Sequence, residues 1–106
     1  MGLFNFQNST QKQISADAAT IGRVMREVIQ MMESGSLTYS VKSRVSSKLS
    51  SIETESHRIV NNINSLSDSK IMSTRIPWIN GELISANQWV MMFSMMMGEV
   101  AEMLES

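Results

Sequence analysis

The sequence predicts an all-α fold in which three main helices form an antiparallel, coiled-coil-like bundle. Along three long segments, apolar residues recur at alternating steps of three and four, the spacing that places them on one side of a helix. Strand signals occur in only one short stretch, residues 76–84. The length of 106 residues fits a single domain over 1–106, in which residues 1–9 form a flexible or short helical N-terminal arm.

The first helix is expected over about 11–34. Thr10 and Gln13 have the spacing of a capping box, in which two side chains satisfy free backbone groups at a helix start. Gly35 is a natural C-terminal stop. Between these signals runs an uninterrupted apolar seam: Ile14, Ala18, Ile21, Met25, Val28 and Met32.

The second helix is expected over about 37–73. Its apolar seam is narrow and is interrupted at Ser56. The surrounding residues are largely Ser and Asn, which are poor helix formers, so the helix must be stabilised by packing. Pro77 disfavours helical geometry in the residue before it and so ends the segment. The seam residues are Val45, Leu49, Ile52, Ile59, Ile63 and Leu66.

Two interpretations fit residues 76–84. Asn80-Gly81 between apolar residues is typical of a hairpin with a two-residue turn, in which both central residues have positive φ. An ordinary interhelical loop containing a turn fits the same residues equally well. The sequence leaves both alternatives open.

The third helix is expected over about 85–105. Ser85 and Gln88 form a second capping box, and Ile84 and Trp89 have the spacing of a hydrophobic staple. The run without charged residues, 83–98, is 16 residues long, shorter than the roughly 20 that a membrane span needs. We therefore expect an amphipathic helix whose apolar seam faces the core. That seam consists of Ala86, Val90, Phe93, Met97, Val100 and Leu104.

The predicted helix lengths favour self-association. A helix of about 35 residues would be roughly 50 Å long, and neighbours of little over twenty residues would leave parts of its seam uncovered. A second copy of the chain normally buries such strips. The hypothesised oligomer core is the seam of the second helix: Val45, Leu49, Ile52, Ile59, Ile63 and Leu66. In the same arrangement Glu99, Glu102 and Glu105 would approach Lys48, His57 and Arg58.

The composition argues against most kinds of catalysis and metal binding. The chain has no cysteine, which excludes disulfides and thiolate metal sites. The single histidine, His57, and Glu53 give at most two metal ligands where a site needs three or four. No phosphate-binding loop or nucleophile motif occurs. We therefore expect no catalytic residue, no cofactor and no metal, and the protein is not expected to be an enzyme.

Charge gives little reason to expect nucleic-acid binding. The net charge of −1 creates no overall field toward nucleic acid or anionic lipid. Lys42, Arg44 and Lys48 form a short basic cluster without an accompanying recognition motif. The three basic side chains are explained by a helix face that is exposed to solvent.

Three residues lack a purely structural explanation. Met91 and Met95 fall on the polar side of the third helix, and Trp78 lies at the turn before it. Methionine is over-used at partner-binding surfaces, and tryptophan is enriched at binding hot spots. We hypothesise that Trp78, Met91 and Met95 form a partner-binding surface. The alternative is that the two methionines are simply tolerated at the surface.

These observations predict a non-enzymatic, self-associating protein-interaction module. It would be a small adaptor, inhibitor or assembly component, for example of a bacteriophage or a secretion system, whose partners are itself and another protein. The first alternative is a membrane-active protein that inserts its methionine-rich third helix, and the second is a DNA-binding regulator. The N-terminal residues carry no secretory signal, so a cytoplasmic protein is expected, and leaderless export or incorporation into a particle are compatible with the same residues.

Overall fold

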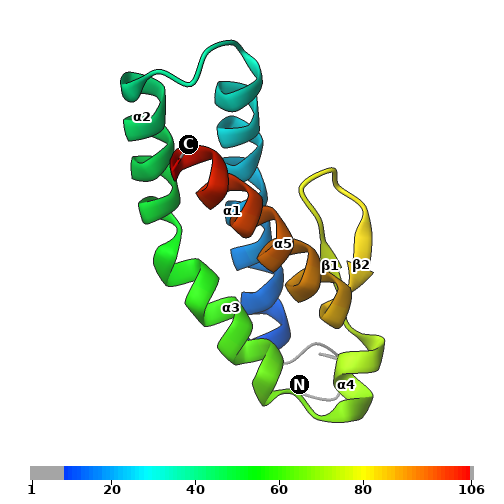
Figure 1. Ribbon diagram of the computed structural model, residues 1–106. Helices are drawn as coiled ribbons and strands as arrows, with labels where there is room; N and C mark the ends of the chain where they lie inside the picture. Colours follow the sequence, from blue (N-terminus) through cyan, green and yellow to red (C-terminus); the bar gives the residue numbers. More distant parts are fainter. Residues whose placement is uncertain (1–8, 106) are drawn as a thin grey trace.

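The computed structural model describes residues 9–105 and confirms the all-α class (Figure 1). The arm expected at residues 1–9 lies, apart from Ser9, outside the described residues. The described elements are α1 (Ser9–Glu33), α2 (Tyr39–Ser51), α3 (Glu53–Ser65), α4 (Asp68–Ser73), β1 (Arg75–Pro77), β2 (Leu83–Ser85) and α5 (Ala86–Glu105).

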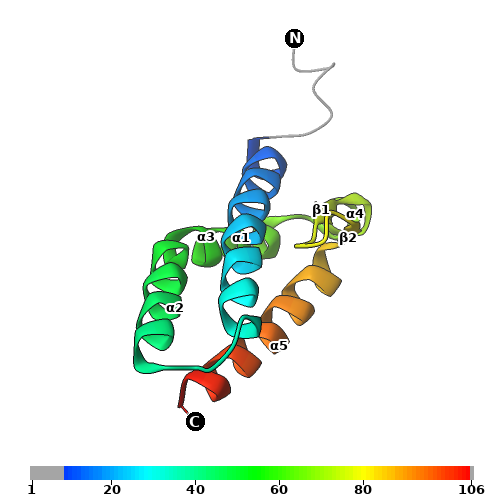
Figure 2. The same cartoon turned by 90° about the horizontal axis from the view of Figure 1, so that it is seen from above.

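Helix α1 lies at the centre of the fold, between the α2–α3 pair and the β1–β2 hairpin (Figure 2). Its predicted seam is buried from Ile14 to Val28. The predicted capping box at Thr10 is wrong, because the helix already includes Ser9 and Thr10. The Gln13 amide instead donates to a carboxylate oxygen of Asp17, one turn further on, at 3.0 Å. Gly35, with φ of 152°, follows the helix end as expected.

The prediction of one continuous helix over 37–73 is wrong, because the segment forms three helices. The backbone leaves helical geometry at Ile52, where φ is −111° and ψ is 13°, and again at Leu66, where ψ is 146°. Just before each break, a serine hydroxyl donates to the backbone carbonyl three residues earlier: Ser51 to Lys48 and Ser65 to Asn62. Such local bonds compete with helical hydrogen bonds, which is why a serine-rich segment breaks readily.

Because the segment is broken, α2 and α3 follow the length of α1 and cover it (Figure 1). The residues hypothesised as an oligomer core are therefore buried within a single chain: Val45, Ile52, Ile59, Ile63 and Leu66. Leu49 is partly buried beside them. Their burial requires no second copy, so the length argument for self-association fails. Self-association itself stays a prediction.

Two ion pairs join the α2–α3 pair to α1. The Arg58 guanidinium binds Asp17 through two hydrogen bonds of 2.7 and 2.8 Å, and these bonds raise the pKa of Arg58. The Lys48 ammonium lies 2.8 Å from Glu27, and this hydrogen bond and charge lower the pKa of the Glu27 carboxyl. The expected approach of Lys48 and Arg58 to the glutamates of the C-terminal helix is therefore wrong, because both cations pair with α1.

The stretch after α4 is a β-hairpin, which decides between the two alternatives for residues 76–84. Ile76 pairs with Ile84 in antiparallel register. The loop does not have the predicted two-residue turn, because only Gly81 has positive φ, at 89°, and Asn80 does not. The Gly81 amide donates to the carbonyl of Trp78, and the Trp78 amide donates to the carbonyl of Glu82. This pattern is a three-residue loop in which glycine takes the left-handed position.

Helix α5 begins where it was predicted. The Ser85 hydroxyl accepts a hydrogen bond from the amide of Gln88 at 3.2 Å, which is half of the expected capping box. Trp89 is 1 % exposed and stacks on Phe93 with ring centroids 4.9 Å apart. Figure 1 shows α5 running from the hairpin across the α1 and α2–α3 layer toward the end where α1 and α2 are connected.

Candidate protein-binding site

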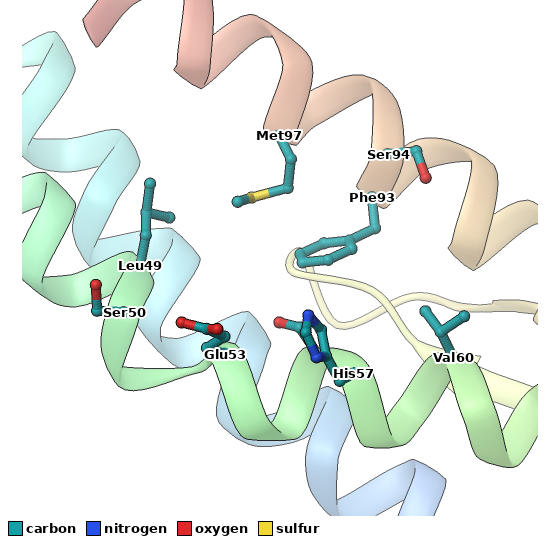
Figure 3. Close-up of a pocket in the computed structure, with 9 residues that line it drawn as sticks. Leu49, Ser50, Glu53, His57, Val60, Phe93, Ser94 and Met97 are labelled. Carbon is teal, nitrogen blue, oxygen red and sulfur yellow. The ribbon is translucent and has the colours of Figure 1, made fainter.

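An open groove lies between α5 and the side of the α2–α3 pair that faces it (Figure 3). Its volume is about 440 Å³. It exists because α5 meets the rest of the fold mainly at the hairpin and α4, while its middle stands apart from α3. Residues from both walls line the gap: Leu49, Ser50, Glu53, Ser56, His57 and Val60 from the α2–α3 side, and Phe93, Ser94 and Met97 from α5.

The floor of the groove is apolar. Phe93 is mostly buried, and Leu49, Val60 and Met97 are partly buried against the core. Figure 3 shows Met97 extending from α5 toward Leu49, with the Phe93 ring beside it. Met97 has a flexible, polarisable side chain that can adjust to a shape placed against it. The floor can therefore accept an apolar side chain from another molecule.

The rim of the groove is polar and carries one acidic side chain. Glu53 and His57 lie one turn apart on α3 and are both exposed. Figure 3 shows both side chains directed into the gap toward α5. Within the described residues, neither side chain belongs to a cluster of three or more His, Cys, Asp or Glu that could hold a metal ion. The rim thus offers a carboxylate and hydrogen-bonding groups beside an apolar floor.

The exposed methionines were placed correctly from the sequence. Met91 is 57 % exposed and Met95 is 61 % exposed, although both are large apolar side chains. They lie on the side of α5 opposite Trp89 and Phe93, because Met91 follows Trp89, and Met95 follows Phe93, by two residues, which correspond to a rotation of about 200° around a helix. Helix α5 thus has an inner side that packs against the core, a flank that lines the groove, and an outer side with two exposed methionines.

Trp78 is not brought together with the methionines. Its ring packs edge-on against Trp89 at a centroid distance of 6.0 Å, on the inner side of α5. The hairpin tip that carries it is also fixed to α1, because the Arg26 guanidinium donates to the carbonyl of Ile79 at 2.8 Å. A packing role explains Trp78, and we leave it out of the proposed partner surface.

This placement gives a prediction on stability. Trp78→Ala is expected to lower the free energy of unfolding by about 1–3 kcal/mol, because the side chain is partly buried in an aromatic cluster. The double variant Met91→Glu, Met95→Glu is expected to change it by no more than about 0.5 kcal/mol, as is usual for exposed positions. Urea denaturation of dilute protein measures both. Equal decreases in the free energy of unfolding of the two variants would contradict the assignment of Trp78 to the fold and of the methionines to the surface.

Sequence reasoning missed the groove residues. Leu49 was assigned to an oligomer core, His57 and Glu53 were considered as metal ligands too few to form a site, and Met97 was considered as a core residue. It also missed the Asp17–Arg58 pair, although a signal was present. Asp17 stands three residues after Ile14 on the apolar side of α1, and a carboxylate there requires a partner.

The first alternative function expected from the sequence was insertion of α5 into a membrane. None of the helices within residues 9–105 has the length and apolar character needed to cross a bilayer. Insertion of α5 would also require the buried side chains of Trp89, Phe93 and Val100 to leave the core.

Comparison of the chain with family models, with curated proteins and with solved structures finds no match. The function therefore has to be argued from the residues of this chain.

Proposed function

We propose that the protein acts without catalysis, as a self-associating helical module that binds another protein. The observation that carries the proposal is the groove between α3 and α5, with its apolar floor and acidic rim. A volume of about 440 Å³ is within the range of ligand pockets and is enough for one or two large side chains. Grooves between helices are a common binding site for an amphipathic helix from a partner.

The chemistry of the groove defines the partner segment. Its floor calls for an apolar anchor such as leucine, methionine or phenylalanine. Glu53 on the rim calls for lysine or arginine beside that anchor. Complementary charges of this kind increase the association rate and set the orientation of binding. We therefore propose an amphipathic, basic segment as the partner.

Catalysis is left out of the proposal for a physical reason. The titratable side chains at the groove, Glu53 and His57, are both exposed to solvent. Catalytic acids and bases usually depend on burial or on a close charged partner to tune their protonation. An adaptor, an inhibitor or an assembly component is the role that a groove of this kind supports.

Selection of peptides from a library of amphipathic helices tests the proposal. The enriched peptides are expected to carry a large apolar residue about one helical turn from a lysine or arginine. Met97→Glu places a charge in the apolar floor and Glu53→Lys reverses the rim charge. Met97→Glu is expected to weaken binding of the selected peptides by about tenfold or more, the size of effect seen when a central contact is lost. Glu53→Lys is expected to weaken binding severalfold, because the reversed rim charge repels a basic partner.

Glu82→Lys is the matched control, because it makes the same charge change at an exposed residue that does not line the groove. It is expected to change affinity less than about twofold, because an exposed charge away from the binding site is screened by solvent and salt. A library that enriches no peptide, or peptides that bind the Met97→Glu variant as tightly as the unchanged protein, would contradict the proposal.

A further inference from the structure

The outer side of α5 carries a second seam. Six exposed residues follow one another at steps of three, four, three, four and three: Gln88, Met91, Met95, Gly98, Glu102 and Glu105. This is the spacing with which one helix packs along another. The inner seam of α5 already faces the core, whereas every residue of the outer seam is exposed to solvent.

Gly98 is the unexplained member of this seam. Glycine in a helix interior costs roughly 0.5–1 kcal/mol relative to alanine. Gly98 does not have positive φ, and nothing lies within 4 Å of the position that a Cβ atom would occupy. No contact within the described residues therefore requires a glycine here. A helix from outside that approaches closely would require one.

We propose that two copies of the chain pair through this outer seam, with their α5 helices antiparallel across a twofold axis near residues 96 and 97. In this register Met95 of each copy covers Gly98 of the other, so an exposed methionine fills the space that the glycine leaves open. Met91 lies beside the methylene groups of Glu102, and the Gln88 amide can donate to the Glu105 carboxylate of the other copy.

The charges of α5 select the antiparallel orientation. Its three charged residues, Glu99, Glu102 and Glu105, all lie in the last two turns, and the part before them carries no charge. A parallel pair would place like charges side by side. An antiparallel pair places each acidic end beside the uncharged N-terminal half of the other helix, where the helix dipole gives a partial positive charge. The open space at Gly98, the exposed Met95 at matching spacing and the uncharged half of α5 opposite its acidic end together favour a second copy as the occupant of this surface.

This inference rests on the self-association included in the proposed function, and light scattering separates the two. At about 100 µM, where mass action favours assembly, the unchanged protein is expected to have twice the 11.9 kDa mass of one chain. Gly98→Leu is expected to have the mass of one chain. Leucine favours a helix more than glycine does, so helicity measured by circular dichroism should not fall.

Ala101→Leu is the matched control, because it enlarges another small, exposed residue of α5 that lies off the outer seam. It is expected to remain a dimer. A monomeric unchanged protein would overturn self-association and this pairing together. A dimer that persists in Gly98→Leu would overturn the pairing and leave self-association standing. Gly98→Leu is not expected to change peptide binding at the groove. Peptide binding therefore tests the groove independently of the pairing.

Disulfide trapping tests the orientation, since the chain has no cysteine of its own. A mixture of the Met91→Cys and Glu102→Cys variants is expected to give the mixed disulfide on mild oxidation. Dominant cross-linking of Met91→Cys to itself would indicate a parallel pair and overturn the antiparallel arrangement.

Discussion

Replacing Trp89 with alanine is expected to lower the free energy of unfolding by about 3–5 kcal/mol, the usual cost of removing a buried aromatic side chain. Trp89 is 1 % exposed and contacts the rings of both Phe93 and Trp78. The variant therefore leaves a large cavity where α5 and the hairpin meet the core. A domain of this size has a total stability of only about 5–15 kcal/mol, so the loss is severe. Urea denaturation followed by circular dichroism measures it.

Trp89→Phe is the control for this prediction. It keeps an aromatic ring in the stack on Phe93 and removes less volume, so it is expected to lose less stability than Trp89→Ala. A Trp89→Ala variant as stable as the unchanged protein would contradict the position of α5 on the core.

Ile52→Asp is expected to unfold the chain. Ile52 is 1 % exposed, and burying a carboxylate in this apolar position costs several kcal/mol. The hypothesis that Ile52 belongs to an oligomer core predicts a different result, a folded but dissociated chain. Circular dichroism and sedimentation of dilute protein separate the two results.

Thr54→Asp is the matched control, because Thr54 is exposed two residues further along, in the first turn of α3. Acidic residues are favourable near a helix start, so this variant is expected to keep its fold. A folded monomeric Ile52→Asp variant would contradict the burial of Ile52 within one chain.

The first and last helices could be predicted because their signals are local. The seam of α1 from Ile14 to Val28 and the start of α5 after Ser85 depend on residues three or four positions apart. The exposure of Met91 and Met95 followed from the same periodicity. Local spacing was sufficient in each case.

The middle of the chain could not be predicted in the same way. The breaks at Ile52 and Leu66 depend on how serine side chains compete for backbone carbonyls, and periodicity does not report this competition. The pairing of Arg58 with Asp17, which are 41 positions apart, depends on how α3 packs along α1. The segment predicted as one long helix therefore forms three helices, and the residues inferred as an oligomer core lie in or beside the core of a single chain.

The groove was beyond prediction for a related reason. Its walls come from α3 and α5, and its space exists because these helices stand apart, which no spacing within either helix reveals. Trp78 was assigned to the surface because its turn was evident, whereas its contact with Trp89 depends on where the hairpin folds back.

A spectrum of the methionine methyl groups, recorded with and without a peptide selected from the library, tests the central claim most directly. The eleven methionines include Met25 in the core, Met97 in the groove, and Met91 and Met95 on the outer side of α5. Addition of the peptide is expected to shift the Met97 signal strongly and to leave Met25, Met91 and Met95 nearly unchanged. A spectrum in which Met97 does not move while the peptide is bound would contradict the claim that the groove between α3 and α5 is the binding site.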